Sequence, residues 1–261
     1  MAIQINGWKN PKQSWIGIRC TEETFAKSFV EEGEIKFSSP QSWVDHAKEN
    51  IGRGDPYEGM VACSPEYDFE RLSKLRAKYP ELRQDRYNGT VIFRRPADMI
   101  LPCFCYYSLS NKLFKCPTTP GVHSLPFHIP TEYFSGFDDA KPAIVIFRIS
   151  EFHQLLLNYL LSHGVKREEI LIQKVQYFEH DSGMWIDINC LSPQELFCKT
   201  SQFRVQQEDR IVINSSKLEI QKLFENTIKI GDLRTISQYC NNAQLEKEHG
   251  LDVTMKVRVE A

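Results

Sequence analysis

The sequence predicts a single α+β domain whose core contains many strands. Apolar runs of strand length recur along the chain, and the clearest are Met99–Tyr107 and Ala143–Ile149. Patterns of helical period lie between them; the strongest is Glu151–Ser162, which Ser150 precedes and Gly164 follows. A length of 261 residues suits one large domain. We therefore expect one domain over residues 1–261, in which residues 215–261 form a C-terminal extension packed on the core.

In the first half of the chain, alternation of apolar residues and capping signals define each element. Thr21 is placed to cap the first helix and Gly33 to end it, and Asn88-Gly89 is a hairpin dipeptide. The expected elements are a strand at Trp15–Cys20, a helix at Glu22–Glu32, a strand at Glu34–Phe37, a helix at Gln41–Glu49, a strand at Met60–Ser64, a helix at Glu66–Lys78, a hairpin arm at Thr90–Arg95 and a buried strand at Met99–Tyr107.

The second half opens with Lys115–Lys141, a segment rich in Pro, Gly, Ser and Thr whose length is typical of a lid or binding loop. The elements expected after it are strands at Ala143–Ile149 and Ile170–Phe178 around the helix Glu151–Ser162, a short helix at Ser192–Leu196, a strand from Phe203 to Ile213, a helix at Lys217–Phe224, and strands at Thr227–Ile230 and Val253–Val259.

Composition excludes several classes of function. The formal net charge is −2, so no global basic field attracts nucleic acid, although a local patch remains open. No apolar run approaches the roughly 20 residues of a membrane span, and the N-terminus lacks a signal core. The eight cysteines form no CxxC pair, so we expect reduced thiols in a cytoplasmic protein and no zinc site.

The segment from Phe203 to Ile213 carries an unusual concentration of functional groups. Written as a strand, it places Phe203, Val205, Ile211 and Ile213 on one face and Arg204, Gln206, Glu208 and Arg210 on the other. A carboxylate between guanidiniums stays ionised, because opposite charges favour the charged form. The alternative interpretation is a solvated strand face held by ion pairs.

Other candidate residues lie at the ends of expected strands. Arg19 ends the first strand beside a helix N-terminus, which suits a phosphate, unless it pairs with Glu22. Asp55 and Glu58 lie in a Gly- and Pro-shaped turn, where they either cap the backbone or face a cleft. The hydroxyls of Ser108 and Ser110 follow a buried strand, where a site and a helix N-cap look alike.

Three segments resemble a bacterial family of unknown function. Gly54-Asp55-Pro56-Tyr57-Glu58 is similar to its Asn-Asp-Pro-Phe-Glu motif, and Cys103-Phe104-Cys105 to its Cys-Phe-Ser strand. Lys199 through Arg210 resembles its closing Lys, Trp and Glu-x-Glu-x-Arg segment, with Phe203 in place of the tryptophan and Gln206 in place of the first glutamate. The resemblance covers roughly residues 17–214 and implies no activity by itself.

The same order of residues resembles ADP-ribosyltransferases of the Arg-Ser-Glu type. The matching residues are Arg19, Ser108-Leu109-Ser110 and Gln206-Gln207-Glu208. That resemblance implies a mixed, split and bent sheet with NAD in the cleft, Arg19 on a cofactor phosphate, and Ser108 or Ser110 orienting Glu208. Asp55, Glu58 and Arg210 would complete the cofactor site. Glu208, with Gln206 beside it, would stabilise the oxocarbenium-like state as nicotinamide leaves, because positive charge develops on the ribose.

Two other classes of function stay open. Asp55, Glu58 and Glu208 have the oxygen ligands that a divalent metal needs, and the arginine-rich stretch 71–95 carries aromatic residues suited to a phosphate backbone. These features favour a metal-dependent nuclease or a nucleic-acid-binding protein. A non-catalytic interaction module would keep the fold and use Lys115–Lys141 for its partner. The acceptor macromolecule, the pathway and the oligomeric state do not follow from the sequence.

Overall fold

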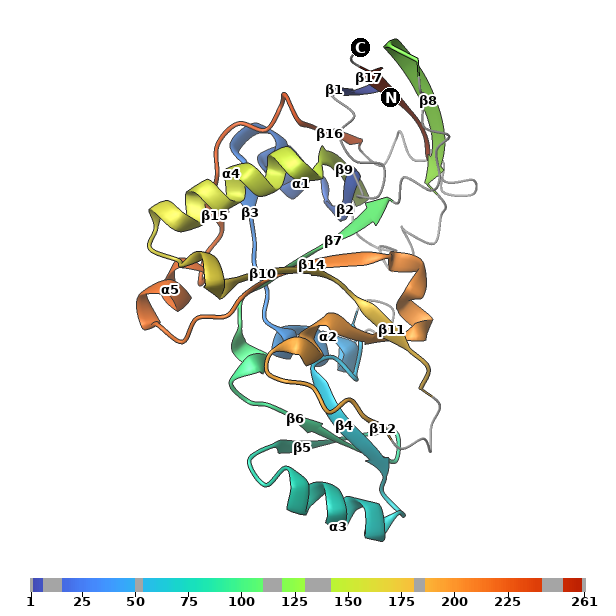
Figure 1. Cartoon of the computed structure of the whole chain (residues 1–261), viewed down its shortest axis with the longest axis vertical. Helices are drawn as coiled ribbons and strands as arrows, with labels where there is room; N and C mark the ends of the chain where they lie inside the picture. The colour runs from blue at the N-terminus through green and yellow to red at the C-terminus, as the bar shows by residue number, and fades with distance from the viewer. Residues whose placement is uncertain are drawn as a thin grey trace.

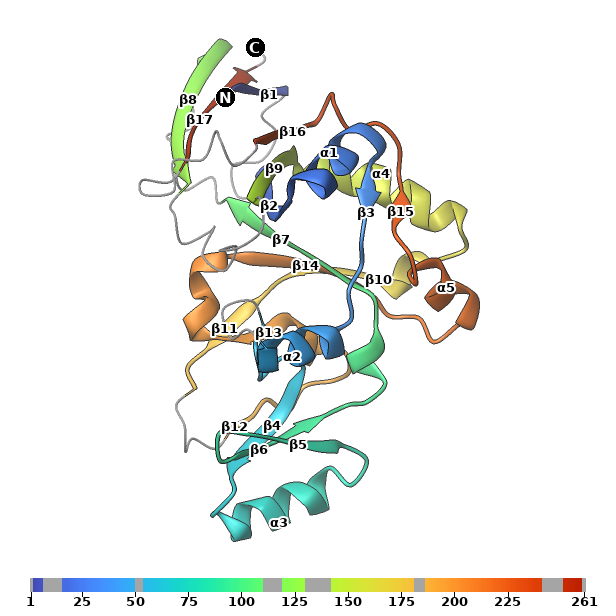
Figure 2. The ribbon, with the colours of Figure 1, turned by 180° about the vertical axis from the view of Figure 1, so that it is seen from behind.

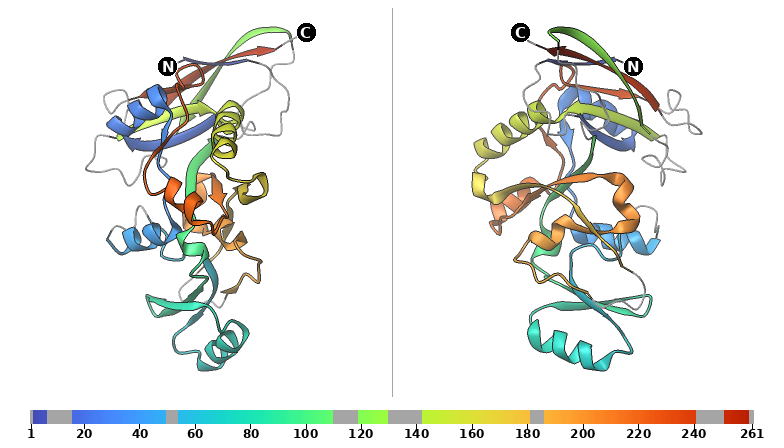
Figure 3. Two further views of the ribbon diagram at one scale, coloured as in Figure 1. Left: turned by 90° about the vertical axis from the view of Figure 1, so that its left-hand side faces the viewer. Right: turned by 45° about the vertical axis from the view of Figure 1, so that its right-hand side comes forward.

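The chain forms an elongated α+β structure in which three larger sheets are arranged one after another and two two-stranded sheets accompany them. The computed structural model describes residues 2–6, 16–49, 54–109, 119–129, 142–180, 186–240 and 251–259. A three-stranded sheet lies at one end, a six-stranded sheet in the middle and a four-stranded sheet at the other end (Figure 1). The views in Figure 3 show both termini at the end of the molecule opposite to helix α3 (Phe69–Lys78).

The six-stranded sheet is antiparallel throughout and has the order β10-β14-β7-β2-β9-β16. Its strands are β2 (Ile16–Glu22), β7 (Cys103–Leu109), β9 (Pro142–Arg148), β10 (Ile170–Lys174), β14 (Glu208–Ile213) and β16 (Ser237–Cys240). The apolar runs in the sequence supply the central strands, and β9 is buried from Ala143 to Phe147. The α+β class predicted from the sequence is therefore confirmed.

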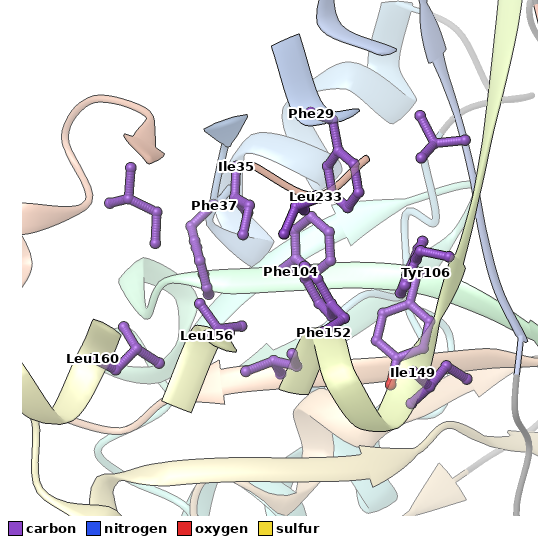
Figure 4. Packing of buried hydrophobic residues seen from close by; sticks show 14 of the residues in the cluster. Phe29, Ile35, Phe37, Phe104, Tyr106, Ile149, Phe152, Leu156, Leu160 and Leu233 are labelled. Atoms are coloured by element: carbon purple, nitrogen blue, oxygen red, sulfur yellow. The ribbon is translucent and has the colours of Figure 1, made fainter. Parts of the chain in front are cut away.

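Helices α1 (Glu23–Glu32) and α4 (Ile149–Ser162) contribute to the main core on one face of this sheet. Phe152 of α4 lies against Phe104 of β7 and Phe147 of β9, with ring centroids 5.7 and 4.7 Å apart. Leu156 and Leu160 continue this packing along α4 (Figure 4). Residues at helical spacing thus bury the face that the sequence assigned to this helix.

The four-stranded sheet has the order β12-β4-β6-β5, and α3 packs on it. Its strands are β4 (Met60–Pro65), β5 (Arg83–Tyr87), β6 (Thr90–Arg94) and β12 (Ile186–Asp187). The predicted hairpin turns at Asn88 and Gly89, which have φ values of 44° and 70°. Two successive positive φ values define the turn that Asn-Gly favours, so this prediction is confirmed.

The remaining elements connect these sheets. The three-stranded sheet contains β1 (Ala2–Asn6), β8 (Gly121–Ile129) and β17 (Leu251–Val259). The others are β3 (Glu34–Ile35), α2 (Pro40–Glu49), η1 (Asp98–Ile100), η4 (Arg167–Glu169), β11 (Gln176–Phe178), η5 (Gln194–Phe197), β13 (Cys198–Thr200), η6 (Ser201–Gln206), α5 (Leu218–Leu223) and β15 (Ile228–Lys229). Residues predicted as an extension enter the core directly, because β15 pairs with β3 and β16 with β9.

Three local predictions were wrong. The segment Lys115–Lys141, predicted as a lid or binding loop, contains the strand β8 (Gly121–Ile129), which pairs with β17. Phe203 does not begin a strand, because residues 201–206 form the 3₁₀ turn η6 and β14 begins only at Glu208. The polar residues Glu208 and Arg210 are buried rather than solvated. Thr21 does not cap α1: it lies within β2, and the helix begins after Glu22 without a side-chain cap. No helix in the described ranges is long and apolar enough to cross a membrane.

Candidate functional site

The central sheet divides between β2 and β7. β7 pairs with β14 from Cys103 to Tyr107, and β2 pairs with β9 along its whole length. Between β2 and β7 only three residue pairs form, and the last joins Ile18 to Tyr107. Figure 2 shows β7 meeting β2 only near the arrowhead of β7. The backbone of β7 before Tyr107 therefore lacks β2 as a partner.

Arg19 occupies this division. Its Nη1 donates a hydrogen bond of 2.6 Å to the carbonyl oxygen of Cys105, an acceptor that a neighbouring strand would otherwise fill. Its guanidinium carbon lies 4.5 Å from the ring centroid of Phe104. Burial lowers the pKa of Arg19, and the nearby groups of Cys105 and Tyr107 oppose that shift. Among the described residues no carboxylate forms an ion pair with Arg19. The pair with Glu22, which the sequence left open, is therefore not formed.

A cavity of about 220 Å³ opens beside Arg19. The aromatic rings of Phe25, Phe29 and Phe104 line it, together with Cys20 next to Arg19. The other charged lining residues are Glu22, Glu34 and Lys36. Flat apolar walls with a few charged groups are typical of a ligand site. Neither Ser108 nor Glu208 lines this cavity.

Glu208 is held by two cations on the other face of the sheet from the main core. Its Oε1 accepts from Arg210 Nε at 2.5 Å and its Oε2 from Lys199 Nζ at 3.0 Å. Burial alone would raise its pKa, but Arg210 and Lys199 outweigh burial and bring the pKa to about 2. Gln206 belongs to the same group, because its Oε1 accepts from Lys199 Nζ at 2.7 Å.

Arg210 joins Glu208 to Glu58. Its Nη2 lies 2.9 Å from Glu58 Oε2, and its Nη1 also donates to Glu58 and to the carbonyl of Leu196. The guanidinium carbon lies 4.9 Å from the Trp43 ring centroid. Burial raises the pKa of Glu58, and Arg210 opposes that shift. We call Glu58, Lys199, Glu208 and Arg210 the Arg210 network.

Asp55 stabilises the local backbone through hydrogen bonds and does not line the cavity beside Arg19. Its Oδ1 accepts from the backbone N–H of Tyr57 at 2.8 Å, which is the capping interpretation of this turn. Its Oδ2 accepts from the N–H and hydroxyl of Thr200, each at 3.2 Å. Across the described ranges no three Asp, Glu, His or Cys side chains gather as metal ligands. Cations of the chain already engage the carboxylates of Glu58 and Glu208.

Tyr107 interacts electrostatically with both Arg19 and Glu208, and sequence reasoning missed it. Its Cα is paired with Glu208 on β14 and with Ile18 on β2. Residues paired in this way point to the same face, so Tyr107 accompanies Glu208. Burial and the charges of Cys20 and Glu208 raise the pKa of Tyr107, whereas Arg19 lowers it. Only the register between strands could have revealed this residue.

Ser108 lies on the opposite face and contacts the turn before Glu208. Its N–H and hydroxyl both lie 3.1 Å from the carbonyl oxygen of Gln207. Gln207 has a φ of 40°, which is unusual for a residue with a side chain. Ser108 thus supports the backbone that places Glu208 and does not bind its carboxylate. Ser110 lies outside the described residues.

The arginine-rich stretch 71–95 is largely engaged within the protein. Arg94 is buried and donates to Asp85 at 2.6 Å, and Arg83 shares the same carboxylate. Arg71 and Arg86 pair with acidic neighbours on the surface. Because carboxylates of the protein already pair with these arginines, the stretch fits a solvated surface of alternating charges better than a basic surface that follows a phosphate backbone.

Arg19 and Ser108 therefore lie on the face of the sheet that carries the main core, whereas Tyr107 and Glu208 lie on the other face. Arg19 interacts electrostatically with both Tyr107 and Glu208. Asp55 and Glu58 are held in structural contacts. Comparison with family models, with curated proteins and with solved structures gave no match to this chain.

Proposed function

We propose that the protein binds NAD or a related nucleotide at the division between β2 and β7 and cleaves its nicotinamide–ribose bond. ADP-ribose would pass to an acceptor macromolecule or to water. The observation that carries this proposal is the guanidinium of Arg19, which lines a cavity and has no carboxylate partner among the described residues. The resemblance to ADP-ribosyltransferases supplies the reaction class.

The cavity suits a phosphate joined to a flat ring. A partly buried cation without a counter-charge is costly, and phosphate oxygens would supply that charge. Phe104 already stacks on Arg19, and Phe25 and Phe29 offer further aromatic surface. A volume of about 220 Å³ is smaller than the roughly 300–1,000 Å³ of sites that enclose a drug-sized ligand. The cavity would therefore hold only part of a dinucleotide.

Glu208 would supply the carboxylate that the reaction needs. As the bond from the ribose C1′ to the nicotinamide nitrogen breaks, the electron pair leaves with nicotinamide, and the ribose becomes positively charged. An acceptor oxygen then adds to C1′ and gives its proton to solvent. With a pKa of about 2, Glu208 is ionised at neutral pH and can stabilise the positive ribose. Lys199 and Arg210 fix its orientation.

The direct test is to incubate the protein with NAD, follow release of nicotinamide and measure the heat of NAD binding. Arg19→Ala should weaken binding, since its expected partner is a ground-state phosphate. Arg204→Ala is the matched control, because Arg204 is exposed and pairs with Glu179. Glu208→Gln should keep affinity but lower turnover by roughly 10²–10³. A circular dichroism spectrum would check that each variant folds.

The same experiment separates the other two functions. Cleavage of labelled nucleic acid that a chelator abolishes and NAD does not affect would support a metal-dependent nuclease instead. No heat of NAD binding, no nicotinamide and no nucleic-acid cleavage would contradict both enzymes and favour an interaction module.

A further inference from the structure

A second buried acidic cluster lies away from the candidate site, between η1 and the segment that leads into η5. Asp98 begins η1 and has 5% of its surface exposed, and Glu195 lies in η5 with none exposed. The carboxyl group of Asp98 lies beside that of Glu195. We call Arg95, Asp98 and Glu195 the Glu195 cluster.

One cation faces these two acids. Arg95 Nη1 lies 2.7 Å from Glu195 Oε2, and Arg95 Nη2 donates to the carbonyl of Cys190 at 2.7 Å. The hydroxyl of Ser192 donates to Asp98 Oδ1 at 2.9 Å, and the thiol of Cys190 lies 3.6 Å from Glu195 Oε2. Each acid thus has one oxygen that is satisfied.

The other oxygen of each acid is buried and lacks a donor. Within the described part of the chain, Asp98 Oδ2 and Glu195 Oε1 have no hydrogen-bond partner. Two ionised carboxylates cannot donate to each other, and buried polar atoms are normally satisfied. A single proton between these two atoms would supply the missing donor, with the other carboxylate as its acceptor.

We propose that Glu195 holds a proton at neutral pH and donates it to Asp98, and that this contact is a pH-sensitive latch between η1 and η5. Loss of that proton to solvent leaves two negative charges against Arg95 alone, and their repulsion loosens η5. The latch reaches the Arg210 network through Leu196, the neighbour of Glu195, whose carbonyl accepts from Arg210. This inference does not depend on NAD.

The remaining groups around the pair support this assignment. Burial raises the pKa of Glu195 to about 7, the hydrogen bond with Asp98 adds to that rise, and Arg95 opposes it. Burial also raises the pKa of the thiols of Cys190 and Cys198, which both respond to the charge of Glu195. These thiols are therefore neutral near pH 7, and Arg95 is the charged group that faces the two acids.

The test is unfolding of the full chain by denaturant between pH 5 and pH 9, with Glu195→Gln as the matched variant. For an acid whose pKa rises on folding, stability falls as pH rises from the unfolded value of 4.5 toward about 7. The unfolding constant of the native chain should rise by roughly tenfold per pH unit across that range relative to Glu195→Gln. Parallel curves would overturn the proposal.

A titration of the native protein provides a readout that does not depend on the variant. Carbon-13 NMR of the carboxyl groups should show Glu195 titrating near pH 7. Amide exchange in residues 190–197 should quicken above that pH. Titration of Glu195 below pH 5 would overturn the proposal even if Glu195→Gln fails to fold.

Discussion

The Arg210 network and the Glu195 cluster are both buried, and each contains two acids, yet the pKa values of Glu208 and Glu195 shift in opposite directions. Glu208 has two cations on its carboxylate and a pKa of about 2. Glu195 pairs with one cation, Arg95, and has a second acid, Asp98, beside it, and its pKa is about 7. Burial raises the pKa of both groups, so the number of cations per acid decides the direction.

Glu58 fits the same rule within the Arg210 network. Its hydrogen-bonding cation is Arg210, which it shares with Glu208, and burial raises its pKa. Depth in the protein therefore does not predict which buried acid is charged. The charge of Glu208 depends instead on Arg210 and Lys199, so these two cations are the residues to substitute.

Removal of the shared cation should have the largest effect. Arg210→Met leaves Glu58 without its partner and Glu208 with Lys199 alone, and breaking a buried pair costs about 3–5 kcal/mol. The measurement is urea unfolding at pH 7. Arg204→Met is the control, because its exposed pair with Glu179 contributes at most about 1 kcal/mol. Equal losses in the two variants would contradict the comparison.

Acid should weaken the Arg210 network but not the Glu195 cluster. The pKa of Glu208 falls from 4.5 to about 2 on folding, so its contribution is present above pH 4.5 and is lost as pH falls through about 2. That shift corresponds to about 3 kcal/mol. Unfolding measured from pH 6 to pH 2 should show this loss in the native chain, and Glu208→Gln should remove it. In the same range Glu195 stays protonated and contributes no such loss.

Removal of the second cation should have a smaller effect. Lys199→Met deletes one charged hydrogen bond to Glu208 and leaves Arg210 in place, which predicts a loss of about 1.5–3 kcal/mol. The pKa of Glu208 should rise above about 2, whereas that of Glu195 should not change. Carboxyl NMR measures both in one sample. An unshifted Glu208 would show that Arg210 alone sets its charge.

Much of the sheet could be predicted from local sequence. The apolar runs predicted β7 and β9, and alternation predicted the part of β14 from Glu208 onward and correctly put Glu208 and Arg210 on one face. What local pattern could not show is which elements cover that face. Lys199 and Glu58 reach it from distant segments, so residues that look solvated in the sequence are buried.

The candidate site depends on register between strands, which no single segment encodes. Tyr107 acquires its position only because β7 pairs with both β14 and β2. The left-handed Gln207 separates η6 from β14, and its turn is held by the local bond from its N–H to the carbonyl of Arg204 and by the contact of its own carbonyl with Ser108. The contact between Asp98 and Glu195 likewise joins two segments that are about 100 residues apart in the sequence.

The hydrogen bond from Arg19 to the carbonyl of Cys105 also means that the side chain of Arg19 holds β2 and β7 apart at the division. If the pairing of Ile18 with Tyr107 continued in register, Cys20 would stand opposite Cys105. The guanidinium holds the acceptor that this pairing would use. With a small side chain at position 19, the pairing of β2 with β7 would continue past Ile18 and Tyr107 and close the division. The division between β2 and β7 thus depends on the side chain of Arg19, whose guanidinium takes the place of a backbone N–H group from a neighbouring strand.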